Sequence, residues 1–270
     1  MENKIQAYGT QIRGKLLNDV EYYTEQILIN GFCIISDVLS TKEITFFKNR
    51  TLELEEMQVN SFGKTRIEKI NDTGNVRAPL DYDENFLELS MNDKIMDAVS
   101  RILGEYFILH LQNAIINRPQ LFHNQSQWHR DIPYQHFTSS KPLALSAFFL
   151  IDDFSEATGG TIVLPFSHKI EELPSEKFVN ENMKTIEAKA GSVLLFDSML
   201  FHRGGSNTSN NIRIGINNVY VRPFMKQQID LQYATNNKYK NNFKVSRFLG
   251  YSSNTPKDVE DYRNIKINKV

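Results

Sequence analysis

The pattern of hydrophobic and polar positions is helical in the first hundred residues. Apolar side chains recur every three or four positions, and a glycine follows two of the apolar stripes, as is typical of a helix C-terminus. Ser40 and Glu43 have the spacing of a capping box, which marks a helix N-terminus. We therefore expect three helices: residues 14–30 closed by Gly31, a helix from Ser40 towards Met57, and residues 91–103 closed by Gly104.

From about residue 105 the pattern changes to short β-type segments separated by Gly, Pro, Asn and Ser turns. A first such segment, residues 32–38, already follows the first predicted helix. The others are residues 106–116, 142–151, 161–165, 192–197 and 212–221. Helices followed by a run of short strands predict an α+β fold whose core is a sandwich or barrel.

The chain is long enough for one large domain, and no repeat or low-complexity linker divides it. We expect a single domain over residues 1–270. Its parts are N-terminal helices over about 1–104, a β core over about 105–222, and a polar end segment, 223–270. The hexapeptide SRFLGY in that end segment is expected to pack back onto the core.

Composition and charge limit the possible partners. The 31 Lys and Arg residues nearly balance the 32 Asp and Glu residues, so the net charge of −1 argues against nucleic acid or anionic membranes. The longest apolar stretch, residues 144–151, is too short to span a bilayer, and the polar start does not resemble a signal peptide. Cys33 has no second cysteine with which to pair. These features favour a soluble cytoplasmic protein; they do not indicate an oligomeric state.

Candidate chemistry is concentrated in the segment SQWHRDIPYQH, residues 126–136. His129 and Asp131 face the same side if the backbone between them is extended. His202, just after the apolar segment SVLLFD, supplies a third ligand. Two histidines and one carboxylate suit Fe(II) and leave positions open for a 2-oxo acid and O₂. Taken alone, His-x-Asp is more often a structural histidine beside a surface aspartate.

Arg213 strengthens the iron hypothesis. It follows His202 by 11 residues (213 − 202) and lies on the next β segment, where its guanidinium is suited to bind the distal carboxylate of 2-oxoglutarate. The alternative is a surface arginine on an edge strand. If Ile212, Ile214 and Ile216 faced the interior of the barrel, Arg213 would point outward.

Three blocks together resemble the phytanoyl-CoA dioxygenase family of Fe(II)/2-oxoglutarate oxygenases: WHRD, GGTIVLPFSHK and GSVLLFDSMLFHRGGSNTSNNIR. The resemblance extends roughly from Gly31 to Arg222. It implies a double-stranded β-helix, a cupin-like jelly roll with helices packed on one sheet. It also implies iron ligands and residues that contact cosubstrate or substrate. By this resemblance the iron ligands would be His129, Asp131 and His202, and Arg213 would bind the 2-oxoglutarate carboxylate. Arg77 and Gln112 fall near family positions that contact cosubstrate or substrate.

Some residues stand apart from this pattern. Phe166 replaces the glycine that the family usually has in Pro-Gly-Ser-His-Lys. This replacement affects the expected conformation of the local turn and not the iron site. Gln112 alternates with His110 and Ala114, so it is either a polar group in the pocket or a solvated strand residue. Trp128 either lines the pocket or packs in the core. For His123, His136 and His168, solvated or structural roles are favoured.

The function implied is an Fe(II)- and 2-oxoglutarate-dependent dioxygenase. It would hydroxylate an unactivated C–H bond of a small-molecule or carrier-bound substrate and release succinate and CO₂. Related halogenases replace the carboxylate ligand by a small residue to admit chloride, so Asp131 favours hydroxylation or another oxidative outcome over halogenation. The alternatives are a metal-dependent cupin-type isomerase or hydrolase, and a non-catalytic jelly-roll binding module.

Overall fold

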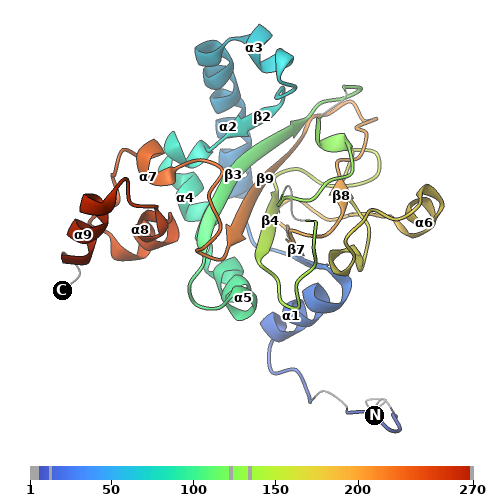
Figure 1. Cartoon of the computed structure of the whole chain (residues 1–270). Helices are drawn as coiled ribbons and strands as arrows, with labels where there is room; N and C mark the ends of the chain where they lie inside the picture. Colours follow the sequence, from blue (N-terminus) through green and yellow to red (C-terminus); the bar gives the residue numbers. More distant parts are fainter. Residues whose placement is uncertain (1–5, 12–13, 122–123, 133–135, 268–270) are drawn as a thin grey trace.

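Two antiparallel sheets form the centre of the molecule (Figure 1). The computed structural model describes residues 6–11, 14–121, 124–132 and 136–267. Its strands are β1 (Phe32–Ile35), β2 (Asn75–Arg77), β3 (Ile108–Asn117), β4 (Ala144–Leu150), β5 (Ile162–Val163), β6 (Lys184–Thr185), β7 (Val193–Asp197), β8 (His202–Arg203) and β9 (Arg213–Val221). The larger sheet has the order β1-β7-β4-β9-β3-β2 and the smaller one β6-β5-β8, which together form the predicted jelly roll.

The helices surround this centre, and the three predicted ones are confirmed. The α-helices are α1 (Asp19–Asn30), α2 (Thr41–Phe62), α3 (Lys64–Lys69), α4 (Glu84–Ser90), α5 (Asp93–Leu103), α6 (Glu176–Asn182), α7 (Leu231–Ala234), α8 (Phe243–Phe248) and α9 (Val259–Ile267). Both bonds of the Ser40–Glu43 capping box are present at the start of α2. Two boundaries differ from the prediction: α1 begins at Asp19 because Asn18 caps its first turn, and α2 continues past Met57 to Phe62.

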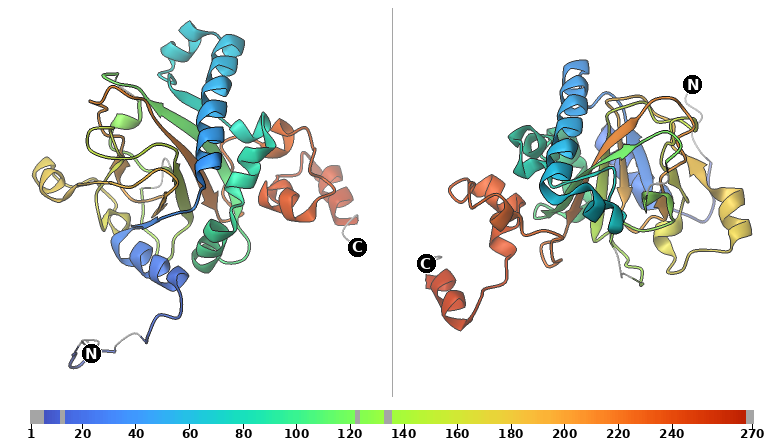
Figure 2. Two further views of the ribbon diagram at one scale, coloured as in Figure 1. Left: turned by 180° about the vertical axis from the view of Figure 1, so that it is seen from behind. Right: turned by 90° about the horizontal axis from the view of Figure 1, so that it is seen from above.

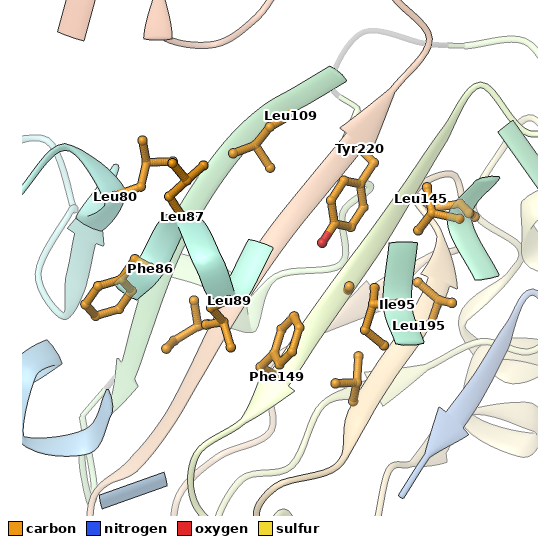
Figure 3. Close-up of a cluster of buried hydrophobic side chains, with 14 of the residues drawn as sticks. Leu80, Phe86, Leu87, Leu89, Ile95, Leu109, Leu145, Phe149, Leu195 and Tyr220 are labelled. Atoms are coloured by element: carbon orange, nitrogen blue, oxygen red, sulfur yellow. The ribbon is translucent and has the colours of Figure 1, made fainter. Parts of the chain in front are cut away.

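Helices α2, α4 and α5 cover one face of the larger sheet, which is clearest from behind (Figure 2). Side chains of α4 and α5 such as Phe86 and Ile95 point towards strand residues such as Phe149 and Tyr220 (Figure 3). The Tyr220 hydroxyl also donates to the Ser90 carbonyl at 2.9 Å. This helix-covered face holds the main hydrophobic core.

The opposite face of the larger sheet looks towards the smaller sheet, and we call it the pocket face. Side chains alternate between the two faces along each strand. On β9, Ile214 and Ile216 are completely buried in the core under the helices. Arg213 and Asn217 therefore lie on the pocket face. The sequence left open whether Arg213 points inward or outward. The alternation of side chains on β9 shows that Arg213 faces the pocket.

The C-terminal segment is joined to the same core. Leu231, Phe248 and Leu249 are buried within the hydrophobic cluster that contains the sheet and α5. The SRFLGY hexapeptide thus packs back as expected. Within the described ranges, none of the helices has the length and apolar character needed to cross a membrane.

Candidate metal centre

Backbone pairing brings the two candidate histidines together. His129 and His202 form an isolated antiparallel bridge, with N–O distances of 3.0 and 3.1 Å. Asp131 N donates to Ser198 O at 3.1 Å, which extends the same pairing. The expected strand around His129 is therefore only a bridge, but its extended backbone lets His129 and Asp131 face one point.

The ligand atoms of His129, Asp131 and His202 all lie within 4.8 Å of one another. Asp131 Oδ1 is 3.4 Å from His202 Nε2 and 4.0 Å from His129 Nε2. The three side chains converge from two separate parts of the chain. Two imidazoles and one carboxylate form the facial donor set of non-haem Fe(II) enzymes.

The second nitrogen of each ring determines which nitrogen can bind a cation. His129 Nδ1 lies 2.7 Å from Gln127 O, and His202 Nδ1 lies 2.9 Å from Leu200 O. A carbonyl oxygen only accepts, so each Nδ1 carries the proton. Nε2 is then the metal-binding nitrogen in both rings, an arrangement common to metal-ligating histidines.

The charges of Asp131 and His202 stabilise each other. Burial by itself raises the pKa of Asp131, but the neighbouring His202 and His129 and the hydrogen bonds to the carboxylate outweigh burial and hold this pKa below its usual range. Burial likewise lowers the pKa of His202, and the Asp131 charge more than reverses that effect. Asp131 is thus ready to bind a cation. A metal ion would have to displace the His202 proton.

Arg213 is a buried cation facing the same pocket. It is 2% exposed, its Nη2 donates to Gly159 O at 2.6 Å, and its guanidinium lies 4.4 Å from the Phe154 ring centroid. Burial lowers the pKa of Arg213 to about 10, opposed by Asp152, so the group stays charged at neutral pH. Among the described residues, its buried Nε has no hydrogen-bond partner. A carboxylate would satisfy both the charge and this donor.

One pocket joins the three ligands to Arg213. Its lining residues are Ile115, Asn117, Gln125, Ser126, His129, Asp131, Phe148, Thr161, Phe196, His202, Arg203, Gly204, Arg213 and Asn217. Along β9, Arg213 and Asn217 are four residues apart on the same face, which is about 13 Å at the usual strand rise. Gly215 lies between them and presents no side chain. The residues therefore fit Fe(II) at one end of the pocket and the distal carboxylate of a small 2-oxo diacid at the other.

Gln112 lies outside this pocket, contrary to both sequence interpretations. It is 1% exposed and accepts from Leu80 N at 3.0 Å. Its Nε2 donates to Phe86 O at 2.6 Å and to Asn218 Oδ1 at 2.7 Å. These bonds place Gln112 on the helix-covered face, where it ties β3 and β9 to α4. The prediction is therefore corrected: protein groups under the helices, and not solvent or a cofactor, form the hydrogen bonds of the Gln112 side chain.

Arg77 lies on the pocket face of the larger sheet, but its strand β2 is two strands away from β9, which carries Arg213 and Asn217. It pairs with Asn113, which pairs in turn with Asn217. The guanidinium of Arg77 forms an ion pair with Asp72, with Nε 3.1 Å from Oδ2. Arg77 does not line the pocket between the ligands and Arg213. The structure therefore brings Arg213, but not Arg77, into the pocket that contains His129, Asp131 and His202.

The other residues singled out in the sequence, where the structure describes them, do not line the pocket. His136 is exposed, and burial lowers the pKa of His168 to about 4 while its ring packs near α1. Trp128 packs beside Phe201 and under the Arg203 guanidinium, outside the pocket. His123 lies outside the described residues.

Sequence reasoning missed Ser146 and Asn217. Both donate to Asp131 Oδ2, at 2.6 and 3.0 Å. Ser146 is the one polar residue of the apolar segment β4, and Asn217 lies on β9 two positions from Gly215 and four from Arg213; both side chains are on the pocket face. That combination was the available signal, because a buried polar side chain needs a partner.

Comparison with known sequences agrees with this geometry. Residues 29–215 match the family described as phytanoyl-CoA dioxygenase (PhyH). The chain belongs to the PhyH family. An uncharacterized protein of Mycobacterium tuberculosis is 30% identical over 241 residues, which cover 86% of this chain and 87% of that protein.

Solved structures share the fold. EctD from S. alaskensis, with 2-oxoglutarate and 5-hydroxyectoine, has a TM-score of 0.61 at 19% identity and covers 74% of each chain. The epimerase SnoN from nogalamycin biosynthesis, with Fe³⁺, α-ketoglutarate and nogalamycin RO, has a TM-score of 0.59 at 14% identity. It covers 80% of this chain and 89% of that one. As a PhyH member, the protein is an Fe(II)/2-oxoglutarate-dependent oxygenase that uses O₂.

Proposed function

We propose that this PhyH oxygenase hydroxylates an unactivated C–H bond of a small-molecule or carrier-bound substrate and releases succinate and CO₂. His129, Asp131 and His202 are the proposed iron ligands, and Arg213 the residue that binds 2-oxoglutarate. The observation that carries the proposal is the meeting of these four side chains in one pocket.

The bound cofactors and the protein chain have different roles in the proposed reaction. Bound iron, with 2-oxoglutarate and O₂, supplies the oxidising chemistry. The chain supplies position and environment: Arg213 orients the cosubstrate through its far carboxylate, and the ligands fix the other end. Phe148, Phe196 and Ile115 form apolar walls that exclude water from this pocket.

Asp131 favours hydroxylation over halogenation. Its carboxylate would take the position on bound iron that a halide needs, and hydrogen bonds from Ser146 and Asn217 hold the carboxylate in place. The buried charge of Arg213 likewise supports oxygenase chemistry over the two alternatives. A cupin-type isomerase or hydrolase, or a binding module without catalysis, has no need for a buried guanidinium that faces the ligands.

An oxygen-dependent metabolite screen with Fe(II) and 2-oxoglutarate tests this function. Succinate should form in step with a product 16 mass units heavier than its substrate, and ¹⁸O₂ should label the new oxygen. Added chloride should change nothing. A chlorinated product, or turnover without 2-oxoglutarate, would contradict the proposed reaction.

We also propose that the protein works in the cytoplasm. Cys33 is the single cysteine of the sequence and is buried, so it has no second cysteine with which to form a disulfide, as is usual in a reducing compartment.

A further inference from the structure

The second oxygen of the Asp131 carboxylate has its own set of donors. Ser146 Oγ donates to Oδ2 at 2.6 Å, and Asn217 Nδ2 donates to the same oxygen at 3.0 Å. Ser146 lies on β4 and Asn217 on the neighbouring strand β9. The other oxygen, Oδ1, is the one that faces the two Nε2 atoms.

The direction of the Ser146 bond is fixed by chemistry. An ionised carboxylate only accepts, so the single hydroxyl proton of Ser146 is used on Asp131. Ser198 Oγ, 2.8 Å from Ser146 Oγ, must then donate to Ser146. Ser146 and Ser198 are both completely buried, and Ser198 O also accepts from Asp131 N. A short buried chain of donors therefore ends on Asp131 Oδ2.

The orientation of Asn217 follows from the same argument. Its amide nitrogen must face the carboxylate, because the amide oxygen would be repelled by it. Two donors occupy the two lone pairs of Asp131 Oδ2. Oδ2 thus has no lone pair directed at the point where the ligand atoms meet.

We propose that Ser146 and Asn217, together called the Asp131 clamp, are positioning residues that make Asp131 a one-oxygen metal ligand. The inference rests on the proposed iron site. Three protein ligand atoms leave three positions of a six-coordinate ion, enough for a bidentate 2-oxo acid and O₂. A carboxylate that turned to bind through both oxygens would occupy one of these positions.

Residues that orient metal ligands typically change metal affinity by about 10- to 100-fold when they are removed. Ser146→Ala deletes a single oxygen atom. Asn217→Leu keeps a similar volume but removes the donor, and Asn217→Ala shortens the side chain. Each variant should weaken metal binding by about 10- to 100-fold.

Asn113 provides a matched control. It is the same residue type, is buried, and pairs directly with Asn217 on the neighbouring strand β3. In the orientation that satisfies its neighbours, its amide bonds to Gln112 O and Arg77 Nη1 rather than to Asp131. Asn113→Ala should therefore leave metal affinity unchanged.

The experiment measures Mn(II) affinity of the full chain from the electron paramagnetic resonance signal of free Mn(II). The parent protein should bind one Mn(II), and His202→Ala should abolish binding. Thermal unfolding of each metal-free variant shows that it is folded. With Fe(II) and 2-oxoglutarate under anaerobic conditions, the visible absorption maximum should shift in the clamp variants and not in Asn113→Ala.

The outcomes separate the two proposals. Folded Ser146→Ala and Asn217→Leu proteins with the affinity and absorption maximum of Asn113→Ala would overturn the Asp131 clamp and leave the iron site intact. A parent protein that binds Mn(II) no better than His202→Ala would overturn the iron site, and the clamp with it.

Discussion

At the scale of single residues, Arg213 is the residue proposed to bind the cosubstrate. Its side chain is buried and charged, and its Nε has no hydrogen-bond partner in the described part of the chain. Arg213→Met should weaken 2-oxoglutarate binding by about 1.5–3 kcal/mol, or roughly 10- to 150-fold, because it removes charged hydrogen bonds. Isothermal titration to the Fe(II) protein under anaerobic conditions measures this loss.

Pyruvate is the control ligand for Arg213, because it has the 2-oxo acid group without the distal carboxylate. Its affinity should fall much less in Arg213→Met. Equal weakening for both ligands would mean that Arg213 acts through the fold.

Asp197 predicts a pH dependence of stability. Burial raises its pKa to about 6, although Met199 N donates to its carboxylate at 2.9 Å. The unfolded chain releases this proton near pH 4 and the folded chain only near pH 6, so the free energy of unfolding falls as pH rises through this window. Asp197→Asn should be more stable than the parent by about 1–3 kcal/mol at pH 7–8 and equal to it below pH 4. Urea unfolding at both pH values provides the measurement; an equal gain at both would argue against Asp197 as the cause.

The residue scale also shows how far sequence reasoning reaches. The residue types and order of His129, Asp131 and His202 predicted a cluster, and the structure brings them together. The direction of Arg213 could not be read from alternation, because the pattern does not say which face the helices cover. Gln112 was misplaced for the same reason.

At the scale of elements, the turn at Phe166 departs from the family pattern. Phe166 has φ 66°, in the left-handed region that favours glycine, and its side chain is 58% exposed. A left-handed conformation costs a non-glycine residue about 1–2 kcal/mol, and this exposed ring contributes little packing in return.

Phe166→Gly should therefore raise the free energy of unfolding by about 1 kcal/mol. The larger conformational entropy that glycine loses on folding reduces this gain. Phe166→Ala is the control, since it removes the ring but keeps the strained backbone, and it should give no gain. Thermal or urea unfolding compares the three proteins. A loss of stability in Phe166→Gly would show that the ring makes a contact of its own.

The sequence predicted several helix ends well, because the residues that cap a helix lie within a few positions of its end. Ser40 with Glu43, and the glycines after α1 and α5, marked helix ends correctly because caps lie within a few residues. The two-residue strands β5, β6 and β8 depend on pairing with distant segments, so their bounds could not be predicted. The start of α1 was placed too early because Leu16 and Leu17 extend the apolar stripe past the Asn18 cap.

At the scale of the whole molecule, the C-terminal segment and the jelly roll share one core, which supports the proposed single domain. Phe248 is 4% exposed and its ring meets Phe107 edge-on with centroids 6.4 Å apart. Phe248→Ala should cost about 3–5 kcal/mol. Phe243→Ala, in the same helix but 74% exposed, should cost little.

Cooperativity is tested with two probes. The only tryptophan, Trp128, reports on the region near the metal centre, and far-ultraviolet circular dichroism reports on all helices. Their unfolding curves should coincide in the parent protein and shift together in Phe248→Ala. A Phe248→Ala shift seen by circular dichroism alone would make the C-terminal segment a separate unit.

The most direct test of the account is an anaerobic titration of the metal-free protein with Fe(II) in the presence of 2-oxoglutarate. One Fe(II) per chain should produce a weak visible charge-transfer band that requires both components. His202→Ala should lose this band and most of its Fe(II) affinity. A His202→Ala protein that retained the band and full Fe(II) affinity would contradict the assignment of His129, Asp131 and His202 as the iron centre.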